Sequence, residues 1–588
     1  PGPESLQPIA TQLFTGSKAS SHTKERYVYA TPQPNDPMDM YRLLLAAVLL
    51  MSGPLPLPAR QVGPAQPGDP ARTAHTGRIT FAATNIPPEK YQASDFLTTY
   101  ALTPRSQLFM TAFMGKPLSE HLRELAPERT AAALDTLGSY QFSFYVDDQL
   151  VNVVNMPPGN VEAATMHTET IVRKPLIARP RQRTWGESIW NIFLMNGGQQ
   201  ALTEGKHVFK MEIRPFLQLP LRIFGKVIAE GQLAMDVRLD PAIDPDTVQL
   251  HTPQPYGGLA VSRDKFDVNR IKTLKGKTDA YVFKDITSVV VLKNGKLLIE
   301  EYFNGADRST LHDVRSVGKS FASTAAGIAI GEGFLKSEAQ PLKEFYNLKQ
   351  FANYSPAKDN STLRDLLTMS AVFEGNDDKR ESAGNEEKMY PTADWVKFAL
   401  DLPVDSLRPA GEWHYFTAGV VLLGDILHQR VPGGLEQYTD RKLFKPLGIT
   451  QYKWQYTPRK VASTAGGIRL NALDLAKYGQ LYQNGGKWNG RQLVPKGWVD
   501  KTFTRHEAIP GRENEYYGYL FWNRTYQVDG RAYETYYCSG NGGNKIFIFK
   551  DQPLVVVITA TAYNTPYGHA QVDKMMQEYI LPAALGKE

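Results

Sequence analysis

Two pairs of apolar, strand-like segments constrain the fold of this chain more than any other feature. Residues 288–292 and 296–302 flank Asn294-Gly295, a dipeptide that favours the tight turn of a β-hairpin. A second apolar pair, 545–549 and 554–559, lies near the C-terminal end. Three helical patterns lie between the two pairs, at 361–369, 393–401 and 417–430. Strands at both ends of a region with helices between them predict one antiparallel sheet flanked by helices.

The length of the chain indicates more than one domain. A chain of 588 residues is too long for a single hydrophobic core. Residues 79–250 consist of short alternating apolar segments broken by turns, which predicts an all-β, sandwich-like domain whose role the sequence does not reveal. Residues 258–588 form the predicted α/β domain, in which the sheet and its flanking helices are joined by a helical lobe.

The first 78 residues carry the features of an exported protein. Residues 1–37 are polar and are predicted to be a disordered or upstream segment. Met38 begins a short charged region that is followed by an apolar run at 43–51, which is too short to span a bilayer but fits a signal peptide over 38–59. The Pro-rich stretch 60–78 is predicted to be a linker. We expect export to the bacterial periplasm or secretion, without a stable membrane span.

Composition argues against several classes of function. The formal net charge of +6 is spread along the chain, so nothing in it indicates a nucleic-acid partner. One cysteine and eleven dispersed histidines offer no spacing suited to a metal ion, and no cofactor is expected. The oligomeric state is left open by the sequence.

Ser316 and Lys319 form the candidate catalytic pair. A serine hydroxyl needs a partner that takes its proton before it becomes a useful nucleophile. Positions i and i+3 share one face of a helix, with Cβ atoms about 5–6 Å apart, so Lys319 can reach the Ser316 hydroxyl. A lysine removed from water has a lowered pKa and can serve as a base.

The segment around Ser316 and several later segments resemble one family in the same order. These segments are 311–321, 363–370, 409–417, 443–449, 465–468, 474–479, 485–490 and 538–544. The chain resembles the class C-like branch of the serine β-lactamase and penicillin-binding-protein superfamily, which includes family VIII carboxylesterases and nylon-oligomer (6-aminohexanoate-dimer) hydrolases. The resemblance covers about residues 260–580.

The resemblance implies a role for each candidate residue. Ser316 is expected to be acylated, with Lys319 as its proton acceptor. Tyr415 is expected to share the base function or to relay the proton to the leaving group. Its phenol has an ordinary pKa near 10, so we expect a nearby ammonium group to lower it. The backbone N–H groups of Ser316 and Asn541 are expected to form the oxyanion hole.

Two departures from the family pattern narrow the substrate. The second motif ends in Thr417 instead of asparagine, so a side-chain amide that would grip a β-lactam is missing. The third motif reads Cys538-Ser539-Gly540 and begins with a neutral thiol in place of lysine or histidine. These four residues are the predicted substrate-binding positions. They favour a small-molecule ester or amide substrate over a penicillin.

Three functions stay open at this point. The leading hypothesis is a carboxylesterase or amidase that works through an acyl-enzyme. The second is a cell-wall D-amino peptidase or β-lactamase with the same nucleophile. The third is a catalytically weak binding protein that uses its N-terminal β-domain.

Overall fold

The computed structural model describes residues 75–586, apart from 88, 89, 91, 180, 181, 183, 410 and 566. The predicted upstream segment, the predicted signal peptide and most of the predicted linker lie outside the described residues. The described residues fall into two compact units. The first contains the residues up to Leu102 and Ser106–Val237, and the second contains Thr103–Arg105 and the residues from Arg238 onward.

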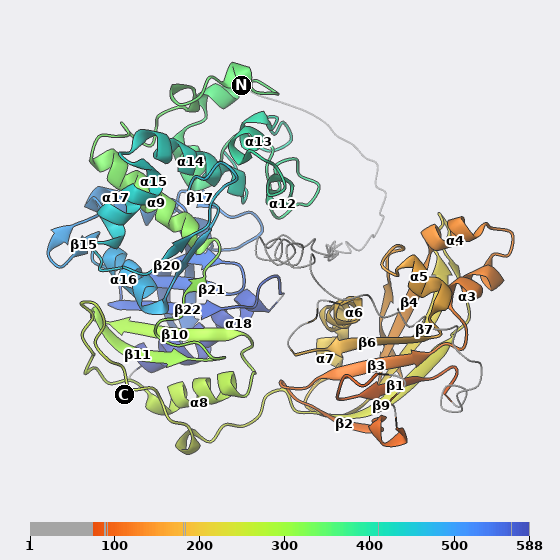
Figure 1. Cartoon of the computed structure of the whole chain (residues 1–588). Coiled ribbons are helices and arrows are strands. Elements are labelled where there is room, and N and C mark those ends of the chain that lie inside the picture. The colour runs from red at the N-terminus through yellow and green to blue at the C-terminus, as the bar shows by residue number, and fades with distance from the viewer. Residues whose placement is uncertain are drawn as a thin grey trace, which may run out of the picture. The chain divides into compact units, whose positions relative to one another are not determined.

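The first unit contains two β-sheets (Figure 1). The smaller sheet has the order β1-β3-β6, with strands Ile79–Ala82, Leu108–Phe113 and Ile171–Ile177. The larger sheet has the order β2-β9-β7-β4-β5, with strands Thr99–Leu102, Ala229–Val237, Gly205–Leu217, Gly138–Val146 and Gln149–Asn155, and β8 (Ile223–Phe224) pairs with β7. All of these pairings are antiparallel except that of β2 with β9.

The prediction of an all-β domain was correct for these sheets but missed the helices between their strands. The helices are α3 (Leu118–Leu125), α4 (Ala131–Leu137), α5 (Ala163–Thr168), α6 (Trp185–Phe193) and α7 (Gln199–Ala201). Leu118 and Leu122 are the buried residues of α3, and their spacing of four is helical rather than strand-like. Helix α6 begins at a capping box, in which Thr184 and Glu187 bond to each other's backbone N–H groups. The unit is therefore a mixture of two sheets and short helices.

Aromatic side chains fill the core of the first unit. The Phe144 and Phe193 rings are stacked with centroids 4.9 Å apart. Trp190 of α6 packs against Phe193 and Phe209 at 5.2 and 5.5 Å. These contacts tie α6 to strands β4 and β7 through ring burial, which contributes strongly to core stability.

The second unit is built on an eight-stranded sheet of order β11-β10-β22-β21-β20-β19-β18-β17 (Figure 1). The strands are Lys296–Tyr302, Ile286–Lys293, Leu554–Ala560, Asn544–Phe549, Arg531–Gly540, Trp522–Val528, Tyr516–Tyr517 and Glu507–Ala508. Asn294 and Gly295 have φ values of 54° and 70°, as the predicted hairpin turn requires. Strand β10 pairs with β22, so the two ends of this unit meet in one antiparallel sheet, as expected.

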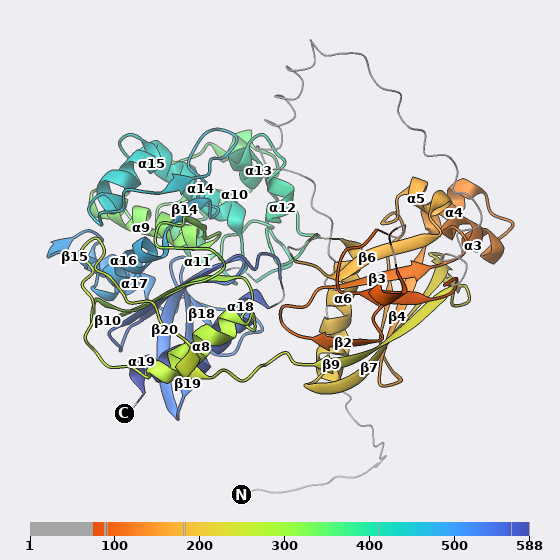
Figure 2. The same ribbon diagram turned by 60° about the horizontal axis from the view of Figure 1, so that its bottom comes forward.

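Helices cover both faces of this sheet. Val290 and Leu292 of β10 face a core that contains α9 (Val317–Gly331) and α16 (Ala472–Gln483). Val289 and Val291 face the opposite core, with α8 (Val268–Asp279), α18 (Gly568–Met575) and α19 (Leu581–Leu585). Figure 2 shows these last three helices together on one side of the sheet. The period-two alternation of β10 thus places α9 in one layer and α8 in the other.

A helical lobe joins the layer that contains α9. It consists of α10 (Pro356–Asn360), α11 (Leu363–Thr368), α12 (Glu386–Met389), α13 (Trp395–Asp401), α14 (Thr417–Arg430) and α15 (Gly434–Thr439). Helix α17 (Lys496–Thr502) and three short strands, β12 (His312–Asp313), β14 (Ile468–Leu470) and β13 (Lys453–Trp454), complete the surroundings of α9. In the part of the chain that the structure describes, no helix combines the length and apolar character of a membrane span.

Candidate active site

Ser316 occupies the N-cap position of α9, a helix that contacts strands β20 and β21 of the sheet and helix α14 of the lobe. A serine at this position usually accepts a hydrogen bond from the first turn of its helix. Here the side chain makes no capping bond. Arg315, directly before it, has a φ of 51°, a left-handed conformation that is uncommon for a residue other than glycine. The sharp turn into α9 leaves the Ser316 hydroxyl available for other partners.

Lys319 is one of those partners. Its Nζ lies 2.8 Å from Ser316 Oγ and also donates to the carbonyl oxygen of Ala465. The side chain is buried, with 1% of its surface exposed. Burial lowers the pKa of the Lys319 amine, while the nearby Glu386 and Asp377 carboxylates act in the opposite direction. A neutral amine held in this way can accept the serine proton.

Tyr415 is the third residue beside the Ser316 hydroxyl. It precedes α14, its side chain is hydrogen-bonded to Ser316, and Lys319 Nζ lies 5.2 Å from the centroid of its ring. Trp522 of β19 stacks on the same ring at 5.8 Å. The structure therefore brings together the three residues that were predicted to be catalytic.

The expected direction of the Tyr415 pKa was wrong. We expected a nearby ammonium group to lower it, but the structure raises it, mainly through burial. The hydrogen bond with Ser316 lowers the pKa, whereas the carboxylates of Glu386, Asp377 and Asp378 raise it further. Tyr415 is therefore a neutral phenol at ordinary pH, suited to relay a proton rather than to act as a phenolate base.

Two glycines bring other segments close to the Ser316 backbone. A Cβ atom added to Gly540 of β20 would lie 2.0 Å from the Val314 carbonyl oxygen and 3.2 Å from Ser316 N. A Cβ atom on Gly466 would lie 2.8 Å from Ser316 N, and Gly466 has a φ of 136°. Close approach of this kind is open only to glycine. The close approach of Gly540 places the end of β20 beside the backbone amide of Ser316. Asn541 directly follows β20, so the two predicted oxyanion-hole residues lie near each other.

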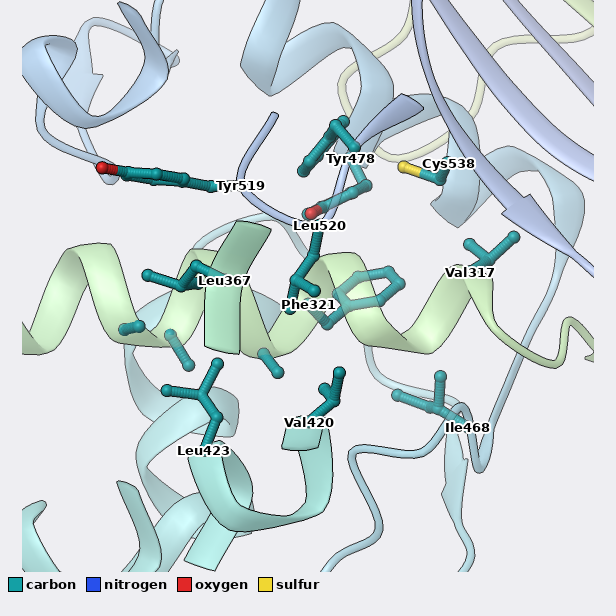
Figure 3. Close-up of a cluster of buried hydrophobic side chains, with 14 of the residues drawn as sticks. Val317, Phe321, Leu367, Val420, Leu423, Ile468, Tyr478, Tyr519, Leu520 and Cys538 are labelled. Atoms are coloured by element: carbon teal, nitrogen blue, oxygen red, sulfur yellow. The ribbon is translucent and has the colours of Figure 1, made fainter. Parts of the chain in front are cut away.

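The predicted substrate-binding residues differ in their accessibility. Ser539 is partly exposed, but Cys538 and Thr417 are fully buried. Figure 3 shows Cys538 among the apolar side chains around α9, near Val317 and Tyr478. Burial raises the pKa of the Cys538 thiol to about 12, so it stays protonated and is a poor nucleophile. The roles given to these residues remain predictions.

Sequence reasoning missed Asp377 and Glu386. Both belong to the segment between α11 and α14, and their carboxylates influence the pKa of Lys319 and of Tyr415. Asp377 Oδ2 accepts a hydrogen bond of 2.7 Å from the Thr417 N–H. Asp377 lies in an irregular loop with no helical or strand period, so its spacing from Tyr415 carried no signal. The described residues contain no group of three or more His, Cys, Asp or Glu side chains placed to hold a metal ion.

A serine, a buried lysine and a tyrosine around one hydroxyl, at the start of a helix beside an antiparallel sheet, define a serine hydrolase of the Ser-Lys type. Residues 285–577 match the model of the beta-lactamase family. This part of the chain belongs to the serine β-lactamase and penicillin-binding-protein superfamily.

Several known proteins are similar to this chain. The 6-aminohexanoate-dimer hydrolase of Paenarthrobacter ureafaciens is 25% identical over 233 residues, which are 36% of this chain and 56% of the relative. The chain thus matches little more than half the length of that curated relative.

Among solved structures, a Bacillus anthracis protein proposed to be a 6-aminohexanoate-dimer hydrolase has a TM-score of 0.44 and 20% identity, covering 57% of this chain and 88% of its own. The octameric penicillin-binding protein homologue of Pyrococcus abyssi has a TM-score of 0.43 and 21% identity, covering 55% of this chain and 78% of its own.

Proposed function

We propose that the second unit hydrolyses small esters or short linear amides through an acyl-enzyme on Ser316. The observation that carries this proposal is the 2.8 Å approach of the buried Lys319 amine to the Ser316 hydroxyl. As Ser316 Oγ attacks the substrate carbonyl, its proton passes to Lys319, and the tetrahedral oxyanion accepts hydrogen bonds from the N–H groups of Ser316 and Asn541. Tyr415 relays a proton to the leaving group. Water then attacks the acyl carbonyl and gives a proton to Lys319, and the bond to Ser316 Oγ breaks as Ser316 regains a proton, which releases the carboxylic acid.

The choice of substrate class rests on what the site lacks. With Cys538 and Thr417 buried, the positions that would receive a penicillin's carboxylate and amide offer no exposed charged or amide group. A linear amide agrees with the name of the curated relative, which acts on a 6-aminohexanoate dimer. Export from the cell remains part of the proposal, supported only by the apolar run at 43–51.

The test is the pre-steady-state release of p-nitrophenol from p-nitrophenyl butyrate. We expect a burst equal to one mole per mole of enzyme, which is lost in Ser316→Ala. Ser323→Ala is the matched control on the same helix, because the Ser323 hydroxyl is buried and has no hydrogen-bond partner among the described residues. A burst that survives in Ser316→Ala would refute the proposal. Stoichiometric labelling by a fluorescent penicillin would instead favour a penicillin-binding protein or β-lactamase.

A further inference from the structure

Asp377 is hydrogen-bonded to the backbone of Tyr415 and to that of Thr417, two residues further on. Its own N–H donates to the Tyr415 carbonyl oxygen at 2.8 Å, and its Oδ2 accepts from the Thr417 N–H at 2.7 Å. Its other oxygen, Oδ1, accepts from the Glu386 N–H at 2.8 Å. One residue from an irregular loop thus bonds to the segment that carries Tyr415 and to the start of α12.

The Asp377 carboxylate accepts hydrogen bonds from two N–H groups, and each of these belongs to the first residue of a helix. Thr417 begins α14 and Glu386 begins α12. The N-cap residue of α14 is Phe416, which has no side-chain oxygen to satisfy the first N–H groups of the helix. A carboxylate at a helix N-terminus satisfies these donors and interacts favourably with the helix dipole. Asp377 therefore caps α14 from a distant part of the chain.

We propose that Asp377 is a positioning residue of the Ser316 centre, which holds the backbone around Tyr415 and so fixes the phenol against Ser316 and Lys319. The inference rests on the proposed function, because it assigns the task of Asp377 within that reaction. An error of about 1 Å in the placement of a reacting group can cost about 100-fold in rate. A backbone held at the Tyr415 carbonyl and at the Thr417 N–H limits such an error.

The charges around Asp377 give the inference a second, electrostatic consequence. Burial and the nearby Glu386 carboxylate raise the pKa of Asp377 to about 7. The hydrogen bonds from Thr417 and the positive charge of a protonated Lys319 act in the opposite direction. The Tyr415 and Tyr390 phenols also face this carboxylate, and their pKa values are raised in part by it.

The direction of the pH effect follows from these charges. Below its pKa, Asp377 is protonated and is a weaker acceptor for the Thr417 N–H, so activity should fall with the pH. The ionised carboxylate also raises the pKa of Lys319, and its removal allows the amine to lose its proton at lower pH. Both effects move the acid limb of the pH–rate profile to lower pH when the carboxylate is replaced by an amide.

The experiment compares Asp377→Asn and Asp377→Ala with Asp378→Asn in the full chain. Asp378 is the matched control, because it is the neighbouring, exposed acid of the same loop and is not among the charges that shift the pKa of Lys319. With p-nitrophenyl butyrate, we expect kcat to fall about 10-fold in Asp377→Asn and about 100-fold in Asp377→Ala, with KM within about 3-fold of the wild type. The acid limb of Asp377→Asn should move to lower pH, and Asp378→Asn should keep the wild-type limb and lose less than about 3-fold in kcat.

Rates are expressed per active site, counted by fluorophosphonate titration, so a loss of folded protein does not imitate a loss of catalysis. An Asp377→Asn variant with the wild-type kcat per site and the wild-type acid limb would overturn the inference and leave the proposed function intact. Equal changes in kcat and in the acid limb in Asp378→Asn would also overturn the inference. The effect would then come from the negative charge of the loop and not from the hydrogen bond between Asp377 and Thr417. A wild type without a Ser316-dependent burst would overturn the proposed function and this inference together.

Discussion

Lys210 in the first unit and Lys319 in the second show how two parts of one chain use the same side chain. Lys210 lies 3.0 Å from Glu212 and 3.0 Å from Glu230, and 31% of its side chain is exposed. These two partners raise its pKa. Lys319 has only neutral hydrogen-bond partners, the Ser316 hydroxyl and the Ala465 carbonyl, and burial lowers its pKa. The first lysine is a permanent surface charge, and the second is a base.

The comparison extends to the other buried lysines. No lysine is buried among the described residues of the first unit, whereas Lys319, Lys358, Lys477 and Lys545 are buried in the second. Lys358 donates to four backbone carbonyls, and Lys477 and Lys545 each contact an aspartate at 2.9 Å. Burying an ammonium group without such compensation is costly, so a lysine that faces a serine hydroxyl indicates a functional site.

The largest expected effect comes from replacing each lysine of this comparison by methionine. Lys319→Met removes the proton acceptor and should lower kcat about 10³- to 10⁴-fold, about 4–5.5 kcal/mol in the barrier. Lys210→Met should leave kcat within about 2-fold, because it removes only a screened surface charge. Steady-state hydrolysis of p-nitrophenyl butyrate measures both. Equal losses in the two variants would break the comparison.

The next effect concerns the stability of the first unit. Trp190→Ala removes a ring packed between Phe193 and Phe209 and should lower the free energy of unfolding of that unit by about 3–5 kcal/mol. Because the catalytic residues belong to the other unit, kcat should stay within about 2-fold. Thermal melts followed by circular dichroism, together with the ester assay, separate the two readouts. A matching fall in kcat would show that the two cores are coupled.

Close packing around Ser316 predicts a smaller loss. Gly540→Ala places a Cβ against the Val314 carbonyl and should push β20 away from Ser316, lowering kcat about 100-fold, about 2.7 kcal/mol. Gly497→Ala is the control, since an added Cβ at Gly497 meets nothing within 4 Å. Burst amplitude and rate in both variants test this. Wild-type kinetics in Gly540→Ala would contradict the predicted oxyanion geometry.

The pH dependence of stability sharpens the contrast between the lysines further. The folded-state pKa of Lys319 lies below its unfolded value, so between those two values the unfolded chain binds more protons and the free energy of unfolding rises with pH. Lys319→Met should lack this rise, with a slope smaller by up to about 1.4 kcal/mol per pH unit. Urea unfolding of both proteins between pH 7.5 and 9.5 gives the difference. Parallel slopes would mean that Lys319 is charged in the folded state.

The smallest expected effect is that of Cys538→Ala. The thiol is fully buried and protonated, so iodoacetamide should not modify the folded protein. Loss of the sulfur should lower the free energy of unfolding by about 1–2 kcal/mol and change kcat less than about 3-fold. Rapid alkylation with loss of the burst would point to a second nucleophile.

The sequence predicted the features that depend on local spacing. The i, i+3 relation of Ser316 and Lys319 follows from helix geometry alone, and the hairpin at Asn294-Gly295 follows from turn chemistry. The meeting of β10 with β22 could be inferred because apolar strand pairs lie at both ends of one unit. Tyr415 came from the order of the family segments, not from spacing.

Other features depend on contacts that no local pattern contains. Asp377, in an irregular loop, accepts a hydrogen bond from Thr417. Gly466, in the connection between β13 and β14, lies against the backbone nitrogen of Ser316. The direction of the Tyr415 pKa depends on burial and on three acidic residues that only the folded chain brings near it. Short helices such as α3 could not be predicted from the sequence pattern, because two buried leucines are too few to establish a helical period.

Fluorophosphonate labelling of the full chain, followed by peptide mapping, tests the central claim most directly. The account predicts a single modified residue, Ser316, in the wild type and in Lys210→Met, with labelling slowed at least about 100-fold in Lys319→Met. Modification of any residue other than Ser316, or labelling of Lys319→Met at the wild-type rate, would contradict the assignment of this serine and lysine as the acylation centre.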